Sequence, residues 1–203
     1  MGKRTENNSR LLSLKTIKSL PRSFRYYLVA IFLLSVGSMP VAVLLLKTTS
    51  IGLAVASIPL FYMVYGVSFS SFSYMSGKLS DEKGSTRILF IGYLALIFSY
   101  IIIALANSYW IFILAFVVLG IFSATTDSAQ RAHTSKVVDF SLQGTAFGLL
   151  NASIGFGAMV AGIVGGYIWQ MYSPAMAMIT ASIAVFVGLI VMSLSKRMKR
   201  NGQ

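Results

Sequence analysis

The sequence predicts an all-α membrane protein that crosses the bilayer as six helices. Of its 203 residues, 56% are hydrophobic and only 11% are charged, a balance that one water-soluble domain cannot bury in a single core. The apolar residues are gathered in six runs. Each run is long enough for a helix, rising about 1.5 Å per residue, to cross a hydrocarbon layer of about 30 Å.

The six expected spans follow one another with short connections. They cover residues 26–46, 51–76, 88–106, 110–130, 144–169 and 174–195. Helices are predicted because each run is apolar on every face, whereas a membrane-spanning strand alternates between apolar and polar residues. Gly37 and Pro40 interrupt the first run, and Pro59 and Gly66 interrupt the second. We expect these two helices to bend at those positions.

Basic segments flank this six-helix bundle, which we assign to residues 26–195. Residues 1–25 are expected to form a cytoplasmic tail. Within it, residues 11–20 are predicted either to lie as a short amphipathic helix on the inner leaflet or to stay disordered. Residues 196–203 are expected to form a second basic tail.

Lysine and arginine are distributed unevenly between the two sides of the predicted bundle. Seven of the 17 precede the first span, three lie within 77–87, two within 131–143 and four follow the last span, whereas Lys47 alone lies on the opposite side. Cytoplasmic segments of membrane proteins carry such an excess. We therefore expect a multi-pass protein of the inner cell membrane with both termini in the cytoplasm. The net charge of +12 follows from this topology, so no nucleic acid partner is expected.

Composition also excludes several kinds of chemistry. The sequence has no cysteine and a single histidine, so a thiol nucleophile, a disulfide and a His or Cys metal site are not available. Within the expected spans the only acidic residue is Asp127, close to the end of its run, which leaves no acid pair at the bilayer midplane. We expect no catalytic residues, no metal, no cofactor and no enzymatic activity.

The connection at 77–87 carries the most distinctive local pattern. It reads GKLSDEKGSTR, with Gly77, Asp81 and Gly84 at fixed spacing. This pattern resembles the signature loop of the major facilitator superfamily, although by itself it is also compatible with an ordinary polar turn.

Other stretches extend the resemblance. DSAQRA at 127–132 followed by QGTAFG at 143–148 is similar to a later connection in that family, and the basic lead-in LPRSFR at 20–25 is similar to the start of its C-terminal half. The resemblance covers about residues 20–195. It implies half of a major facilitator fold, with six transmembrane helices built as two inverted three-helix repeats. It further implies that a small solute is carried by alternating access, together with a second six-helix half. Another copy of the chain, a separate N-terminal half, or loss of that half through truncation would each account for the sequence.

The resemblance also implies a cytoplasmic gate. Its residues are Gly77, Asp81, Gly84, Arg87, Asp127 and Arg131. Asp127 and Arg131 are four residues apart on one helix face, so they can pair with each other, and with Arg87 or Asp81 nearby. Asp81 is also placed to cap the N-terminus of a neighbouring helix. For Asp127, a structural ion pair, a protonatable coupling site and direct solute contact are all compatible with the sequence.

The family fold implies that the first and fourth spans line a central cavity. The candidate cavity residues are Ser35, Ser38, Met39, Tyr65, Phe116, Ser123 and Asn151. Serine and tyrosine in membrane helices also bond to their own or an adjacent helix without touching a solute.

The fifth expected span is rich in glycine. Gly144 and Gly148 are four residues apart, as are Gly162 and Gly166, and small residues at this spacing permit close helix packing in lipid. This helix also suggests an alternative function, in which the chain is a non-transporting membrane subunit that binds another membrane protein through it.

Overall fold

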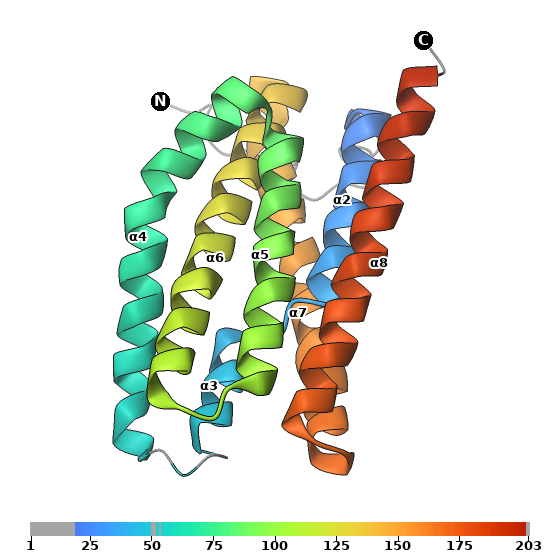
Figure 1. Ribbon diagram of the computed structural model, residues 1–203. Coiled ribbons are helices and arrows are strands. Elements are labelled where there is room, and N and C mark those ends of the chain that lie inside the picture. Colours follow the sequence, from blue (N-terminus) through green and yellow to red (C-terminus); the bar gives the residue numbers. More distant parts are fainter. Residues whose placement is uncertain (1–18, 50–51, 53, 202–203) are drawn as a thin grey trace, which may run out of the picture.

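The computed structural model describes residues 19–49, 52 and 54–201, with side chains described up to Ser193. Residues 1–18, which include most of the expected amphipathic segment, lie outside the described residues. The helices are α2 (Arg22–Val36), α3 (Val41–Thr49), α4 (Ile58–Lys83), α5 (Ser85–Leu105), α6 (Tyr109–Val137), α7 (Gln143–Met171) and α8 (Pro174–Asn201), with short 3-10 turns η1 (Val55–Ser57) and η2 (Phe140–Leu142) (Figure 1). Six spans are long and apolar enough to cross a membrane, and the described residues contain no strand. The predicted fold class is confirmed.

The first span is broken into α2 and α3, as Gly37 and Pro40 predict. Pro40 has no backbone N–H and disfavours the helical conformation in the residue before it. The Met39 N–H, released from the helix, donates a hydrogen bond of 2.7 Å to Tyr100 Oη, and the Tyr100 hydroxyl donates to the Gly37 carbonyl at 3.2 Å. Glycine is required at position 37 because a Cβ there would lie 2.7 Å from the backbone nitrogen of Val185.

The second span is one continuous helix. Pro59 lies in the first turn of α4, where a missing N–H leaves no helical hydrogen bond unmade. The bend predicted at Pro59 is therefore wrong, and α4 also runs unbroken through Gly66.

Helix α4 extends well beyond its apolar run. It continues to Lys83, and α5 begins directly after Gly84, so the loop predicted at 77–87 is mostly helical. Lysine, glutamate and leucine favour helix, and Lys78 approaches Glu82 at 3.9 Å one turn along the exposed surface. The chain reverses at Gly84, whose φ of +90° is accessible to glycine at little cost.

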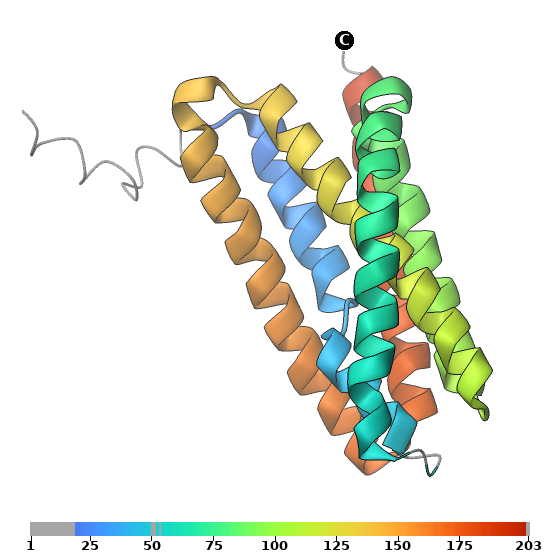
Figure 2. The same cartoon turned by 90° about the vertical axis from the view of Figure 1, so that its left-hand side faces the viewer.

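The neighbours of each helix repeat between the two halves of the chain. Helix α2 packs on α7 and α8, α6 packs on α4 and α5, and α5 contacts α8. Exchanging the first three spans for the last three leaves this set of neighbours unchanged, as expected for two three-helix repeats of opposite orientation. Figure 1 shows α4, α6 and α5 as one group and α2, α7 and α8 as the other, while Figure 2 shows α7 at one edge of the bundle beside α2.

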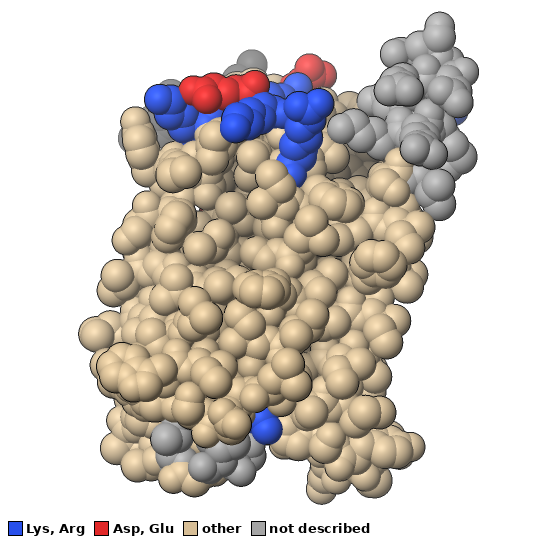
Figure 3. Space-filling view, viewed as in Figure 1, with Lys and Arg blue, Asp and Glu red and all other residues tan. Residues whose placement is uncertain are grey.

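The outside of the bundle is apolar along its sides and charged at one end. Large side chains such as Val29, Phe98, Ile163 and Ile183 are more than half exposed, which suits contact with hydrocarbon and not with water. On the face shown in Figure 3, acidic and basic side chains gather at the end where α4 meets α5. This end corresponds to the side that the sequence assigns to the cytoplasm.

Candidate functional site

Polar side chains inside the bundle meet in one groove between α2, α4, α6 and α7. The groove has a volume of about 450 Å³. It is lined by Ser35, Ser38, Tyr65, Phe69, Tyr93, Phe122, Ser123, Thr126, Asp127, Gln130, Arg131, Asn151, Ile154 and Ala158. Polar and charged groups in membrane helices usually face a bundle interior or a water-filled cavity. In this chain the polar side chains named above face the groove.

Most of the candidate cavity residues lie in this groove. The structure brings together Ser35, Ser38, Tyr65, Ser123 and Asn151. It puts Met39 and Phe116 elsewhere, in the core, at 5% and 0% exposure. The Met39 methyl group packs against Gly165, in the space that a side chain at that position would occupy. The ring centroids of Phe116 and Phe61 are 5.8 Å apart.

Tyrosines from two helices organise the polar wall of the groove. Tyr65 of α4 donates a hydrogen bond of 3.0 Å to Ser123 Oγ of α6, which ties the two sides together. Tyr93, on α5, is buried and lines the groove together with Ser35, Ser38 and Gln130. The bond between Tyr65 and Ser123 satisfies groups that would otherwise be costly to bury.

Asn151, on α7, is different from these residues. It is exposed, and its side chain forms no hydrogen bond with another described residue. Its amide can both donate and accept, so it presents unused hydrogen-bonding capacity to whatever occupies the groove.

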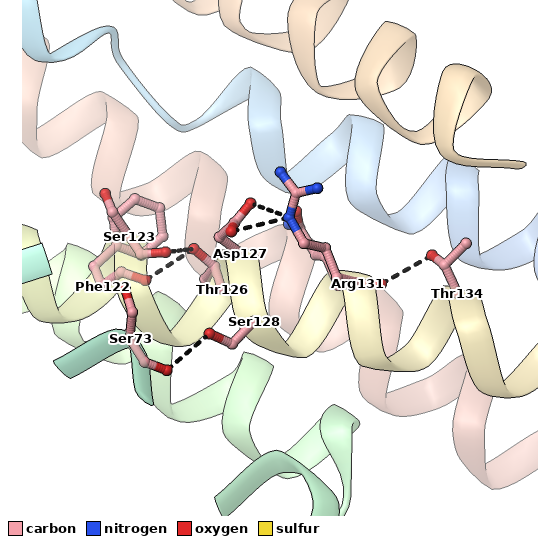
Figure 4. Close-up of polar contacts among 9 residues, drawn as sticks. Ser73, Phe122, Ser123, Thr126, Asp127, Ser128, Arg131 and Thr134 are labelled. Carbon is pink, nitrogen blue, oxygen red and sulfur yellow. Dashed lines mark hydrogen bonds and ion pairs between the residues drawn. The ribbon is translucent and has the colours of Figure 1, made fainter. Parts of the chain in front are cut away.

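One ion pair stands at the rim of the groove. Arg131 Nε lies 3.0 Å from both carboxylate oxygens of Asp127, one turn apart on α6 (Figure 4). The predicted pairing of these two residues is therefore present. Their side chains are 60% and 47% exposed, so neither charge is sealed away from water or from a ligand.

The other predicted gate residues do not join this pair. Asp81, near the end of α4, accepts a hydrogen bond of 2.8 Å from Lys136 Nζ in the last turn of α6. It does not cap α5, because Gly84 occupies the N-cap and no side chain bonds there. Arg87 lies in a separate cleft against α8. The contact expected between the pair Asp127–Arg131 and Arg87 or Asp81 is therefore absent among the ion pairs of the described residues. Asp81 pairs with Lys136 instead.

The glycines singled out for packing have open surroundings within this chain. A Cβ built at Gly144, Gly148 or Gly166 would meet nothing within 4 Å, and one at Gly162 would make only ordinary contact with Pro40 at 3.7 Å. A Cβ at Gly77 of α4 would likewise meet nothing within 4 Å.

Close packing of α7 on α2 uses another glycine. A Cβ at Gly157 would lie 2.4 Å from the Cβ of Ser35, so the two helices touch where no larger residue fits.

Sequence reasoning missed several residues of the site. They are Phe69, Tyr93, Phe122, Thr126, Gln130, Ile154, Ala158 and, in the pair with Asp81, Lys136. Thr126 and Gln130 follow Ser123 at helical spacing and share its face of α6, a signal that could have found them. Tyr93 lies in a run that is apolar all round, so periodicity carried no signal for it.

No group of three or more potential metal ligands occurs within the described part of the chain. The site is therefore described by hydrogen-bonding groups, one ion pair and aromatic rings. Such a wall can bind a small solute through hydrogen bonds and apolar contact.

Comparisons with known proteins agree with this architecture. The family model described as Major Facilitator Superfamily matches residues 25–202. An uncharacterized MFS-type transporter of Methanocaldococcus jannaschii is 29% identical over 201 residues, which cover 94% of this chain and 49% of the relative. The class B tetracycline resistance protein of Escherichia coli is 26% identical over 116 residues, covering 57% of this chain and 29% of that protein. The chain spans about half the length of the first of these relatives. On the family match, which extends over most of its length, the chain belongs to the Major Facilitator Superfamily.

Proposed function

We propose that this chain forms one half of a secondary transporter, which moves a small solute across the membrane by alternating access. The observation that carries the proposal is the polar groove of about 450 Å³ within a bundle whose outer sides are apolar. If the groove faced lipid, the charges of Asp127 and Arg131 would be energetically costly. If a second protein surface covered the groove, its polar wall would become half of a water-filled cavity near the middle of the membrane.

A second six-helix half is the partner that the groove requires in this proposal. It is another copy of this chain, a separately encoded N-terminal half, or the other half of a longer chain of which these residues are a part; each accords with a chain spanning about half of its relative. Helices α4 and α7 occupy equivalent positions in the two repeats. Both carry glycines, such as Gly77 and Gly148, whose absent Cβ would meet nothing within 4 Å. Such positions suit close approach of another helix.

The ion pairs near the charged end support a role as a cytoplasmic gate. We propose that both termini face the cytoplasm, because nearly all basic residues lie on that side. Asp81 and Lys136 then join the cytoplasmic ends of α4 and α6. Asp127 and Arg131 belong to the groove wall, and Arg131 is the lining residue of α6 closest in sequence to Lys136. The four side chains are between 47% and 68% exposed, so each pair is worth about 1 kcal/mol or less and can break during transport.

Cross-linking from α7 tests the requirement for a second half. The chain has no cysteine of its own, so a cysteine introduced at Gly148 is the only thiol, and no neighbouring atom obstructs it. In native membranes, Gly148→Cys is expected to cross-link to a six-span partner of the same family. The matched control is Ile183→Cys, on the outer face of α8 and 58% exposed, which is expected to yield no specific partner.

The same experiment separates the transporter from the alternative of a non-transporting subunit. Identification of the cross-linked partner by mass spectrometry as an unrelated membrane protein would support the alternative. A monomeric chain with no cross-link from Gly148→Cys would contradict the proposed half-transporter.

A further inference from the structure

A second cleft opens on the outer surface of the bundle, between the start of α5 and the distal part of α8. It has a volume of about 300 Å³ and is lined by Thr86, Arg87, Phe90, Ile91, Met192 and Ser193. It shares no lining residue with the polar groove. Helices α5 and α8 are direct neighbours and stand together at the front of the bundle in Figure 1. The cleft therefore faces the surrounding lipid at the charged end of the molecule.

Arg87 brings an uncompensated positive charge to this cleft. It is exposed, and it forms no ion pair with any described acidic residue. The acids closest to it in sequence are engaged elsewhere, since Asp81 pairs with Lys136 and Glu82 approaches Lys78. A guanidinium in this state offers a fork of donors suited to a phosphate.

Below this charge the walls of the cleft are apolar. Phe90 and Ile91 follow Arg87 by about one helical turn, which puts them about 5 Å deeper along α5. Met192 of α8 closes the inner side at 8% exposure, while Phe90 and Ile91 remain 37% and 55% exposed. A cation at the rim above an apolar wall matches a phosphate headgroup above an acyl chain.

The charge of the surroundings favours an anionic lipid over a zwitterionic one. Helix α8 continues for eight residues beyond Ser193, and this stretch carries Lys196, Arg197, Lys199 and Arg200. Basic residues beside a membrane surface each attract anionic lipid, and basic clefts between membrane helices bind acidic headgroups.

We infer that the cleft between α5 and α8 binds one anionic phospholipid, with its phosphate at Arg87 and an acyl chain along Phe90, Ile91 and Met192. This inference rests on the membrane setting of the bundle. It does not depend on the groove carrying a solute, so it can fail or succeed independently of the proposed transport function.

Native mass spectrometry of the purified full-length chain, titrated with phosphatidylglycerol or phosphatidylcholine, tests this site. The unchanged protein is expected to retain one phosphatidylglycerol in preference to phosphatidylcholine. Arg87→Gln is expected to bind phosphatidylglycerol about fivefold more weakly, as the loss of one basic contact implies. The matched control, Arg25→Gln, removes an exposed arginine at the start of α2 outside the cleft and is expected to change the affinity by less than about twofold.

A second variant tests the place of the acyl chain. Ile91→Trp keeps every charge and narrows the cleft, so it is expected to weaken binding of phosphatidylglycerol as well. The inference is overturned if Arg87→Gln and the unchanged protein bind phosphatidylglycerol equally, or if both lipids bind equally well to the unchanged protein. Undiminished binding by Ile91→Trp would also overturn it, because the lipid would then lie outside the cleft.

Discussion

Tyr100 of α5 holds together the break in the first membrane span by accepting a hydrogen bond of 2.7 Å from the Met39 amide. The same hydroxyl donates to the Gly37 carbonyl at 3.2 Å, so one side chain satisfies both ends of the interruption. In the low-dielectric interior of a membrane protein, backbone groups left without partners are costly. The break next to the groove residues Ser35 and Ser38 therefore has a fixed geometry, set from a neighbouring helix.

We predict that Tyr100→Phe destabilises the protein while keeping its packing. The ring is fully buried and remains in place, but the Met39 N–H loses its partner, at a cost of about 1–3 kcal/mol. Thermal unfolding in detergent is expected to show a lower midpoint. Tyr74→Phe serves as the control, because Tyr74 is 84% exposed; equal midpoints for the two variants would contradict the assigned role of Tyr100.

The contact of Gly157 with Ser35 predicts a compensating pair of substitutions. A Cβ at Gly157 would lie 2.4 Å from the Ser35 Cβ, so Gly157→Ala is expected to cost about 1–3 kcal/mol through overpacking. Adding Ser35→Gly removes the obstructing atom and is expected to recover part of the loss, measured by the same unfolding experiment. Gly148→Ala, where a Cβ meets nothing within 4 Å, is the control and is expected to fold as stably as the parent. No recovery in the double variant would show that α2 and α7 do not meet as described.

The pair of Asp81 with Lys136 predicts a shift between gate states. Asp81→Asn removes the contact of 2.8 Å between α4 and α6 and is expected to raise cytoplasmic accessibility of the groove. Because the side chains of Asp81 and Lys136 are 68% and 51% exposed, the pair is worth about 1 kcal/mol or less, and the shift should be about fivefold or smaller. The labelling rate of a cysteine in the groove from the cytoplasmic side measures it.

A charge reversal provides the stricter form of this experiment. Asp81→Lys combined with Lys136→Asp restores opposite charges and is expected to restore the parental labelling rate. Glu82→Gln is the matched control. Its partner Lys78 lies on the same helix, so the pair of Glu82 and Lys78 does not connect two helices. If Asp81→Asn and Glu82→Gln behaved alike, the gate assigned to Asp81 would be contradicted.

The six helices could be predicted from the sequence because hydrophobic length determines a membrane span. The start of α8 at Pro174 and of α7 at Gln143 agree with expectation to within a residue. The prediction was wrong where the helix leaves the apolar layer, since α4 continues to Lys83 through polar residues. The first polar residues of such a segment indicate where the membrane ends, but not where the helix ends. The helix continues while its residues favour helix, and it stops at Gly84, where the chain reverses.

The candidate site was only partly accessible to sequence reasoning. Ser35 and Ser123 were candidates because the family resemblance implies that the first and fourth spans line the central cavity. Met39 lies one residue from a groove residue but turns into the core, since the chain is irregular between α2 and α3. Tyr93 comes from an apolar helix that only tertiary packing brings to the groove. Arg87 was grouped with Asp81 because both belong to the segment that resembles the signature loop, but the chain reverses at Gly84 and Arg87 lies in a different cleft, against α8.

The central claim is that the groove between α2, α4, α6 and α7 is a water-filled half of a solute path. Reaction of Ser123→Cys with a membrane-impermeant thiol reagent, applied in turn to each side of membrane vesicles, tests it most directly. Leu114→Cys is the control, about two and a half turns earlier on α6 and so on the opposite face, with Leu114 54% exposed on the outer surface.

Only a thiol in contact with water ionises and reacts readily. We predict that Ser123→Cys is modified from both sides, and more than about tenfold faster than Leu114→Cys. Equal and slow reaction of the two cysteines would contradict the account.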